Sequence, residues 1–558
     1  MELLEKHFDT AFAAPDGIKK LRELILTLAM QGKLVEQDPN DQPASELLKE
    51  IEAEKARLVK EKKIKKPKQL AKIKADEVPY ALPAGWEWGR FGDLVLVLNG
   101  RAYKKNELLD SGTPVLRVGN LFTSKQWYYS DLTLDEDKYI NSEDLIYAWS
   151  ASFGPFIWEG GKAIYHYHIW KLKFFIEGSP YKEYLYNYLL DATDRIKRAG
   201  SGIAMIHMTK GRMEELLVPL PPLAEQHRIV AKIDQLMARC DELEKLRIEQ
   251  EQKRLAVHTS ALKQLLDAQE QDRFANAWKF LTTNFGELYT VKENVVELRK
   301  AILQLAVMGK LVEQDPSDQP ASELLMEIEA EKARLLKEKK VRKVKPLPEF
   351  SLKDMPYALP ERWEWVRLED VVELGSGVTK GRKLAGKKLI SIPYLRVANV
   401  QRGYLDLAVI KEIEIVENEV EKYSLKYGDL LITEGGDWDK VGRTCLWREE
   451  VPVCGHQNHI FRARKVLNKQ NENWLEKCLN SPISRQYFAG ASKQTTNLAS
   501  INKTQLRGCP IPMPPLTEQR RIVEKLDQLM TLCDDLEHQI DTATNTQNNL
   551  LNAVMAQV

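Results

Sequence analysis

Apolar residues between positions 219 and 266 recur with the spacing of a helix that packs lengthwise against another helix. They lie four, three, four and three residues apart, and most positions between them are Glu, Lys, Arg or Gln. This heptad pattern is typical of a coiled-coil seam. Prolines precede the stretch, and because proline suits only the start of a helix, we expect the helix to begin near Leu223. The seam consists of Ile229, Ile233, Leu236, Cys240 and Leu243.

A second copy of this stretch begins PMPPLTEQRRIVEKLDQLM at position 512. Its seam consists of Ile522, Leu526, Leu529, Cys533 and Leu536. Each helix is expected to run about 40 residues, or roughly 60 Å at a rise of 1.5 Å per residue. The matching seams predict that the two helices pack on each other as a rigid spacer.

Most of the chain outside these helices is duplicated as well. GKLVEQDP at 32–39 recurs at 309–316, inside a 32-residue block that differs at only three positions. The same offset relates the WEW at 86–88 to the WEW at 363–365, while the offset between the two PPL-x-EQ helix starts is 16 residues larger. A repeat of this length indicates two copies of one structural unit, with intervals of different length inside them.

Extended outward, the repeat nearly closes on itself. Met1 corresponds to position 278 and Val558 to position 265, so the chain ends almost where its first copy would begin again. A cyclic order of this kind predicts pseudo-two-fold symmetry within one polypeptide. The two long helices are then expected to be antiparallel, with the two variable intervals at opposite ends.

The repeated segments outside the long helices are also predicted to be helical. Residues 1–31 and 285–308 should form helices that stop at Gly32 and Gly309. A second helix, expected to be capped by Ser45, leads into an arm with ten basic and three acidic residues between positions 52 and 74. A solvated linker and a phosphate-contacting arm both fit this composition.

The two variable intervals, 86–218 and 363–511, have the punctuation of strands and turns. Short apolar runs alternate with Gly, Asp and Ser, and a helical stretch follows the last run. This pattern predicts two small α+β domains. TPVLRVGN and IPYLRVAN share a frame that matches Arg117 with Arg396 and Asn120 with Asn399. We expect one fold with divergent surfaces, and function where the surfaces differ.

Composition restricts the cellular compartment and the class of protein that we expect. No stretch approaches the roughly 20 apolar residues of a membrane span, and the first residues carry acids where a signal peptide needs bases. Six cysteines without a CxxC pair suggest neither a disulfide framework nor a zinc site, so a reducing cytoplasm is expected. A net charge of +1 argues against a polycation that coats nucleic acid.

Catalytic motifs are missing from the sequence. No GxxxxGK[ST] phosphate loop and no [DN]PP[FYW] methyltransferase tetrapeptide occur, and Gly375 and Gly377 are better explained as turn glycines. His166 and His168 lack partners at metal-ligand spacing, which favours packing or hydrogen bonding at a strand edge. We therefore predict no catalytic residue and no metal site.

Recognition chemistry is easier to find on the expected loops. Arg and Lys pair with guanine, and Asn and Gln with adenine, in the major groove. For any single residue, a solvated loop side chain is the alternative, and net charges near −1 and +5 for the two intervals support nucleic-acid binding only weakly. The candidate DNA contacts of the first interval are Arg101, Tyr103, Lys104, Lys105, Ser201, His207, Lys210 and Arg212. Those of the second interval are Lys380, Arg382, Lys383, Trp438, Lys440, Arg443, Lys493, Gln494, Asn497, Asn502 and Lys503.

The whole pattern resembles the specificity subunit of type I restriction-modification systems. The markers are the duplicated PPL-x-EQ helix starts (Pro222 to Gln226 and Pro515 to Gln519), the duplicated GKLVEQDP, the two WEW openings and the cyclic order. The resemblance implies that each variable interval is a target recognition domain that reads half of an asymmetric, bipartite DNA site. It also implies that the spacer docks two adenine-N6 methyltransferase subunits, and that the restriction subunits, an ATP-driven translocase and nuclease, join this core.

On this basis the expected architecture is α+β, with two similar α/β recognition domains separated by a pair of long antiparallel helices. The chain itself is expected to be non-catalytic and to bind no cofactor, with AdoMet, ATP and Mg²⁺ in the partner subunits. The alternative is a coiled-coil scaffold or protein-interaction module; a self-contained nuclease or methyltransferase is disfavoured by the missing motifs. The expected segments are a conserved helical region at 1–85, a recognition domain at 86–218, a central conserved region at 219–362, a second recognition domain at 363–511 and a spacer helix at 512–558.

Overall fold

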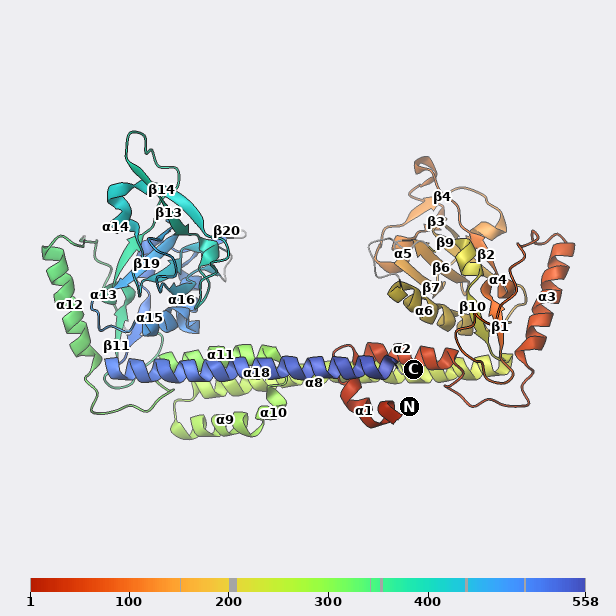
Figure 1. Ribbon diagram of the computed structural model, residues 1–558, viewed down its shortest axis with the longest axis horizontal. Coiled ribbons are helices and arrows are strands. Elements are labelled where there is room, and N and C mark those ends of the chain that lie inside the picture. Colours follow the sequence, from red (N-terminus) through yellow and green to blue (C-terminus); the bar gives the residue numbers. More distant parts are fainter. Residues whose placement is uncertain are drawn as a thin grey trace. The chain divides into compact units, whose positions relative to one another are not determined.

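The computed structural model describes residues 2–150, 152–199, 208–341, 343–351, 355–436, 440–495 and 498–556. The chain divides into two compact units, Met1–Gln250 with Ala543–Val558, and Glu251–Thr542. Both boundaries fall inside long helices, α8 (Leu223–Asp267) and α18 (Leu516–Ala556) (Figure 1). No helix in the described ranges is long and apolar enough to cross a membrane.

The two long helices begin where the prolines predict. α8 is 45 residues long and starts at Leu223, directly after two prolines, and α18 is 41 residues long and starts at Leu516 in the same context. Proline has no amide hydrogen and a fixed φ, so it is tolerated before the first turn but not beyond it. The helix starts were therefore determined by local sequence.

A pair of antiparallel strands opens and closes the first recognition domain. β1 (Glu87–Arg90) pairs with β10 (Leu217–Leu220). Between them lie two four-stranded sheets, of order β2-β9-β6-β7 and β4-β3-β8-β5. The strands are β2 (Val95–Asn99), β3 (Thr113–Leu116), β4 (Tyr128–Ser130), β5 (Tyr139–Ile140), β6 (Leu145–Ser150), β7 (Ser152–Ile157), β8 (Ala163–Tyr165) and β9 (Ile169–Phe174). The helical segments are α4 (Phe91–Leu94), η1 (Lys105–Glu107), α5 (Val118–Phe122), η2 (Glu136–Lys138), α6 (Lys182–Ala199) and α7 (Lys210–Glu214).

The second recognition domain repeats this plan. β11 (Glu364–Arg367) pairs with β22 (Pro510–Met513), and the sheets have the orders β12-β19-β15-β17, β14-β13-β18 and β16-β21-β20. The strands are β12 (Val372–Ser376), β13 (Leu389–Leu395), β14 (Lys411–Val416), β15 (Leu430–Thr433), β16 (Gly435–Gly436), β17 (Thr444–Leu446), β18 (Gly455–His456), β19 (Ile460–Lys465), β20 (Lys493–Thr495) and β21 (Leu498–Ser500). The helical segments are α13 (Leu368–Val371), η4 (Val397–Asn399), η5 (Glu417–Glu419), α14 (Val420–Tyr423), α15 (Glu472–Asn480), α16 (Pro482–Ala491) and α17 (Lys503–Arg507).

Matching strand pairs confirm that the two domains share a fold. β3 pairs in parallel with β8, and β13 pairs in parallel with β18, at equivalent positions. The frame that the sequence predicted is visible as well, because Asn120 accepts a hydrogen bond from the Arg117 amide and Asn399 accepts one from the Arg396 amide. The predicted fold class, α+β with two similar domains and a long helix between them, is confirmed.

The remaining repeated segments are helical, as predicted. The first copy contains α1 (Glu2–Phe12), α2 (Gly17–Met30) and α3 (Ala44–Lys60), and the second contains α9 (Gln271–Thr283), α10 (Phe285–Leu288), α11 (Lys292–Val307) and α12 (Ala321–Lys337). Gly32 and Gly309 follow α2 and α11 with φ of 68° and 71°, a conformation that favours glycine. The predicted cap of α3 was wrong: Pro43 is the N-cap residue, and Ser45 lies inside the helix.

Each long helix buries its seam in the core of its own unit. Ile229, Ile233 and Cys240 are buried in a core that includes Ile25 and Met30 of α2, whereas Leu236 is partly buried and Leu243 is 49% exposed. Within its own unit, the partner of this seam is therefore α2.

The second seam follows the same rule. Ile522, Leu526 and Cys533 are buried with residues of α11, and Leu529 and Leu536 are partly buried. Arg22 of α2 forms ion pairs with Asp241 and Glu244 of α8, and Arg299 of α11 forms ion pairs with Asp534 and Glu537 of α18. A heptad pattern identifies a buried helix face, but it does not identify the element that covers that face.

Candidate nucleic-acid interface

The repeated sequence motifs meet at one buried junction in each unit. The Trp86 indole donates a 3.0 Å hydrogen bond to the Glu225 carboxylate, which also accepts one of 3.2 Å from the Gln37 amide. Burial raises the pKa of Glu225. The junction thus joins the first WEW, the first PPL-x-EQ and the first GKLVEQDP.

The second unit builds the same junction from the second copies of the motifs. Trp363 donates to Glu518 at 3.0 Å, and Gln314 donates to the same carboxylate at 2.8 Å. Burial raises the pKa of Glu518 as well. Each recognition domain is therefore attached to the start of its long helix by equivalent buried hydrogen bonds.

Two further contacts tie the helix start to the preceding chain. The Gln226 amide donates to the Pro221 carbonyl at 2.9 Å, and the Gln519 amide donates to the Pro514 carbonyl at 2.9 Å. Arg228 pairs with Asp41 at 2.7 Å, and Arg521 pairs with Asp318 at 2.7 Å. These contacts explain why the three motifs recur together, because each motif supplies residues to the same junction.

Beyond the junction, each domain presents a strand-end edge, where the turn before β9 or β19 meets the glycine that follows β2 or β12. We define this edge as residues 100–101, 149 and 166–168 in the first domain and 377–378, 434 and 457–459 in the second. In the first domain the Arg101 amide donates to Tyr165 O at 3.1 Å, the Tyr167 amide donates to Arg101 O at 3.0 Å, and the His166 amide donates to Leu116 O at 2.9 Å.

The second strand-end edge has the same backbone hydrogen bonds. The Val378 amide donates to His456 O at 2.8 Å, the Asn458 amide donates to Val378 O at 3.0 Å, and the Gln457 amide donates to Leu395 O at 2.8 Å. A side chain on Gly100 or Gly377 would overlap the carbonyl oxygen of His166 or His456. Two different sequences are thus held in one backbone conformation.

In the first domain the candidate contacts lie in two places. Arg101 and Tyr103 lie at or beside the strand-end edge, with the Arg101 guanidinium 5.3 Å from the Tyr103 ring centroid and paired with Glu107 at 2.7 Å. Burial raises the pKa of Tyr103 to about 12. Lys104 and Lys105 are exposed on the adjoining loop.

The other candidates of this domain lie elsewhere. Lys210 and Arg212 lie on α7, where Lys210 pairs with Glu214 at 3.5 Å and Arg212 is exposed. Helix α7 contacts α4, which directly precedes β2. Ser201 and His207 lie outside the described residues.

In the second domain several candidates are held by internal contacts. Arg382 pairs with Glu419 at 2.8 Å, the Arg443 guanidinium donates to Gln401 at 2.7 Å, and the Lys503 ammonium donates to Leu374 O at 2.8 Å. Burial lowers the pKa of Lys503. Asn502 caps α17 by accepting a hydrogen bond from the Gln505 amide.

The remaining candidates of the second domain are closer to solvent or to the strand-end edge. Lys380 and Lys383 are exposed, and Lys440 is half-buried. β20, which carries Lys493 and Gln494, pairs with β21, and β21 pairs with β16 directly after Glu434. The structure therefore brings the β20–β21 hairpin to the same edge as residues 457–459. Trp438 and Asn497 lie outside the described residues.

Sequence reasoning missed several residues of the strand-end edges: Trp149, Tyr167, Glu434, Gln457, Asn458 and His459. The signal that could have identified them is the alignment of YHYHI at 165–169 with HQNHI at 456–460, which matches in length and ends in isoleucine but differs at its centre. His166 and His168 belong to the first edge, with ring centroids 4.8 Å apart. Within the described ranges, no group of three His, Cys, Asp or Glu residues could hold a metal ion.

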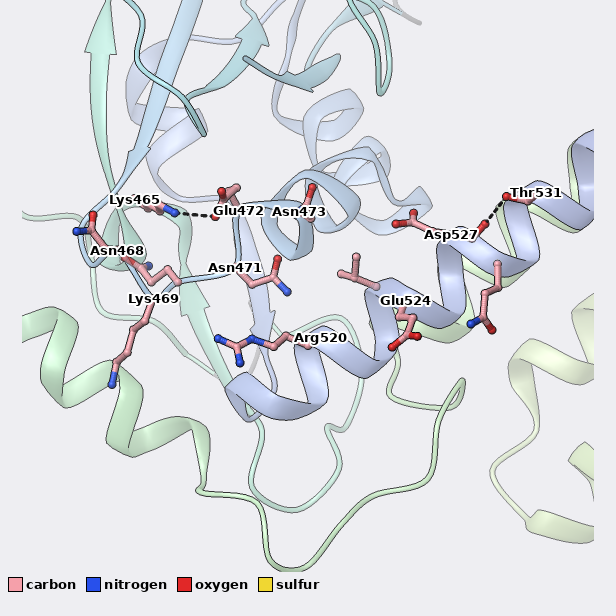
Figure 2. Close-up of a pocket in the computed structure, with 13 residues that line it drawn as sticks. Lys465, Asn468, Lys469, Asn471, Glu472, Asn473, Arg520, Glu524, Asp527 and Thr531 are labelled. Carbon is pink, nitrogen blue, oxygen red and sulfur yellow. Dashed lines mark hydrogen bonds and ion pairs between the residues drawn. The ribbon is translucent and has the colours of Figure 1, made fainter. Parts of the chain in front are cut away.

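An open groove of about 820 Å³ lies in the second unit, between the loop after β19 and the first turns of α18 (Figure 2). Its walls are polar, with Lys465 paired to Glu472 on one side and Arg520 and Glu524 on the other (Figure 2). At the equivalent place in the first unit, the rings of Tyr181 and His227 are tilted by 36°, with centroids 3.9 Å apart. The residues at this place therefore differ between the two units.

The sequence pattern of a known family, the type I restriction modification DNA specificity domain, matches residues 83–253 and 360–544. The chain belongs to this family. The matched ranges contain the two recognition domains and most of the two long helices, so the domain is present twice. The chain is a type I restriction-modification specificity subunit with two recognition domains.

Individual relatives match over nearly the whole chain. The type I restriction enzyme EcoAI specificity subunit of Escherichia coli is 33% identical over 96% of this chain and 93% of its own length. The EcoEI specificity subunit of Escherichia coli is 31% identical over the same shares. Among solved structures, the HsdS subunit from Thermoanaerobacter tengcongensis is 19% identical, with a TM-score of 0.40 over 85% of this chain and 98% of that one.

Proposed function

We propose that this specificity subunit reads an asymmetric, bipartite DNA site, with one half-site assigned to each recognition domain. The observation that carries the proposal is the contrast within the repeat. The two domains share their junctions and the backbone of their strand-end edges, whereas the side chains of those edges differ. Two recognition domains that share a fold but differ in surface side chains fit two half-sites of different sequence.

The chemistry of the edges suits duplex DNA. The second edge carries the amide side chains of Gln457 and Asn458, which can form paired hydrogen bonds with adenine in the major groove. Exposed basic residues lie nearby, including Lys104, Lys105 and Lys380. Basic side chains of this kind bind phosphates and position a protein on DNA without reading sequence.

We further propose that two methyltransferase subunits dock on repeated surfaces of the subunit. α3 and α12 support this, because they are nearly identical in sequence although only Ala44, Leu47 and Ile51, or their counterparts in α12, are buried. Even their surface ion pairs repeat: Arg57 pairs with Glu54 and Glu61, and Arg334 pairs with Glu331 and Glu338. Packing within the protein does not require the exposed side chains of α3 and α12 to be the same. Two copies of one methyltransferase subunit that dock on these helices would require it.

The chemistry of modification and cleavage is assigned to the partners. In this proposal the chain is non-catalytic, the methyltransferase subunits bind AdoMet, and the restriction subunits bind ATP and Mg²⁺. The support is the absence from the sequence of a phosphate loop and of an amino-methyltransferase tetrapeptide.

Exchange of one recognition domain tests the assignment of half-sites. The junction suggests the cut points, directly after Trp86 and directly before Pro221, so that Glu225 keeps its indole partner. The hybrid chain, co-expressed with the methyltransferase subunit, should methylate sites in which one half-site is new and the other unchanged. The measurement is the methylated-adenine motif of the host DNA. A change in both half-sites would refute independent reading.

The length of the long helices is proposed to determine the unread gap. Insertion after Cys240 and Cys533 would break the ion pairs of Arg22 and Arg299 with the next turns, so insertion after Gln250 and Thr542, at the unit boundaries, is the better test. Four added residues lengthen a helix by about 6 Å, close to two base pairs of DNA at about 3.4 Å each. The gap should lengthen while both half-sites stay the same; altered half-sites would contradict the spacer role.

A further inference from the structure

Several of the arginines that first suggest base recognition are engaged within the protein. Arg101 is paired with Glu107, Arg382 with Glu419, and Arg443 with Gln401. A guanidinium has five N–H donors, so each of these contacts occupies part of the donor set and restricts the orientation of the group. These three arginines are therefore held by contacts within the protein and have fewer donors available for a base.

Three side chains in the turns before β9 and β19 show the opposite situation, whereas His459 in the same turn lies with its Nδ1 2.5 Å from a Glu434 carboxylate oxygen. Among the described residues, no hydrogen-bond partner is present for the hydroxyl of Tyr167 or for the side-chain amides of Gln457 and Asn458. Tyr167 is 40% exposed, and both amides are half-buried. Their polar groups are accessible and have their full hydrogen-bonding capacity available.

The backbone beneath these side chains is fixed. Residues 166 and 167 are bonded to Leu116 and Arg101, and residues 457 and 458 are bonded to Leu395 and Val378. Gly100 and Gly377 allow this approach, since any larger residue would overlap the carbonyl that follows β8 or ends β18. A rigid backbone that presents side chains with unused hydrogen-bonding groups is what a specific binding site requires.

We infer that residues 166–168 and 457–459 are the base-reading segments of the two recognition domains. This inference rests on the proposed function, since it names the side chains through which each domain would read its half-site. The segments occupy equivalent positions in the two domains but carry His-Tyr-His in one and Gln-Asn-His in the other. The difference in side chains at a common backbone position would give the two half-sites different sequences.

The chemistry of each segment indicates how it reads. The amides of Gln457 and Asn458 each offer a donor and an acceptor on one planar group, which matches the N6 and N7 edge of adenine. In the first domain, burial together with nearby His168 and Arg117 lowers the pKa of His166 to about 4. His166 is then a neutral donor and acceptor at neutral pH, which suits a base edge better than a phosphate.

One pair of residues provides an internal contrast. Arg117 and Arg396 occupy the same position in the shared frame of the two domains, each directly before the helical turn that contains Asn120 or Asn399. A side chain that is the same in both readers cannot distinguish two half-sites. If these arginines contact DNA, they contact the phosphate backbone, and their loss should weaken methylation at all sites alike.

The test uses isosteric substitutions in the full-length chain, co-expressed with its methyltransferase subunit, with the methylated motif mapped across the host DNA. Gln457→Glu and Asn458→Asp replace a donor by an acceptor without changing shape. Asn468→Asp is the matched control, because it introduces the same change into an exposed position in the loop at the opposite end of β19. In the first domain, Tyr167→Phe removes one hydroxyl, and Tyr186→Phe on α6 is its control.

We expect Gln457→Glu and Asn458→Asp to reduce discrimination at one or two base positions of one half-site by about 10-fold or more. Tyr167→Phe should change only the other half-site, and both controls should leave the motif as it is. An unchanged motif in all three variants would overturn the inference. So would a uniform loss of methylation with an unchanged thermal midpoint, since this would assign the segments to phosphate contact.

The same experiment separates this inference from the proposed function. If the unmodified complex methylates no bipartite motif, the proposed function fails before any variant is considered. If it does so and the variants keep the motif, the base-reading segments lie elsewhere. Should an added carboxylate lower the thermal midpoint of the second unit, Tyr167→Phe decides the question alone, because it adds no charge and no volume.

Discussion

The two recognition domains agree at their junctions and differ at their strand-end edges. At the junctions, Trp86 and Glu225 match Trp363 and Glu518 atom for atom, with equal hydrogen-bond lengths of 3.0 Å. At the edges, Tyr167 and Asn458 occupy equivalent positions in the two domains. Their side chains differ, although their backbone hydrogen bonds are the same. The side chains differ where the bonds common to both domains are backbone bonds, and they are the same where the common bonds are made by side chains.

This comparison shows how one fold can hold two readers. The main-chain bonds of a strand-end edge are the same in both domains although the side chains differ, and each domain adds a side-chain contact of its own, from the Trp149 indole to Tyr167 O at 2.8 Å and between His459 and Glu434 at 2.5 Å. A new half-site would then need new side chains and not a new fold. The junction, in contrast, must be kept intact in every copy.

The largest expected effect concerns the junction. Trp86→Ala and Trp363→Ala each remove an indole that is 5% exposed, and each should lower the free energy of unfolding of its own unit by about 3–5 kcal/mol. Chemical denaturation followed by circular dichroism measures both. Trp278→Ala, where the side chain is 49% exposed, is the control. Costs that differ by more than about 2 kcal/mol between the two units would show that the junctions are not energetically equivalent.

A smaller effect is expected at the glycines of the strand-end edges. Gly100→Ala and Gly377→Ala place a methyl group against a backbone carbonyl and should each cost about 1–3 kcal/mol. Each should also impair methylation, because the turn that it supports must move. Gly161→Ala, at a position with open space, serves as the control. Full stability and an unchanged motif in both variants would mean that the edge is not rigid.

The pair of Asp318 and Arg521 gives a prediction that depends on pH. The hydrogen bond from Arg521 lowers the pKa of Asp318, so the carboxylate stabilises the folded state above the ordinary aspartate pKa of about 3.9. That contribution is lost as the pH falls through the lower folded-state pKa. Asp318→Asn should therefore cost about 1.5–3 kcal/mol at pH 7 and much less near pH 2.

Two matched variants accompany this measurement. Asp41→Asn removes the equivalent carboxylate, which pairs with Arg228 at the same 2.7 Å, and should have a similar cost at pH 7. Asp527→Asn removes a carboxylate whose side chain is 60% exposed and should cost less than about 1 kcal/mol. A cost for Asp318→Asn that does not change between pH 7 and pH 2 would rule out the charged pair as its origin.

The smallest effect is expected for the arginines that fasten α2 and α11 to the long helices. The acids nearest to Arg22 and Arg299 are Asp241 and Asp534, both with side chains 71% exposed. Arg22→Ala and Arg299→Ala should each cost no more than about 1 kcal/mol, and the cost should shrink at high salt. Thermal unfolding at low and high ionic strength measures this. A larger, salt-independent loss would indicate that packing of the arginine stems is the main contribution.

Local patterns predicted the elements well. The prolines before Leu223 and Leu516 determined both helix starts, and strands are present in both intervals where short apolar runs alternate with turn residues. The cap of α3 was wrong because Pro43 already supplies the extended residue before the helix. Ser45, two residues after Pro43, therefore lies inside the helix.

The partners of individual side chains could not be predicted. Arg382 meets Glu419 across 37 positions, Arg443 meets Gln401 across 42, and Lys503 meets Leu374 across 129. The sequence gives no sign of these contacts, because each residue is held by a group distant in the chain. Tyr167, Gln457 and Asn458 were not predicted as DNA contacts, because the sequence does not show that a side chain lacks a hydrogen-bond partner.

The sequence by itself determined the duplication, the long helices, the two α+β domains and the family, because these depend on repeated motifs and on periodicities that a few adjacent residues carry. Only the tertiary structure decided that α2 and α11 cover the seams, that the repeated motifs meet in one junction, and which side chains remain unpaired at the strand-end edges. The physical reason is that burial and hydrogen bonding depend on which distant residues come together, and the same local pattern is compatible with several partners.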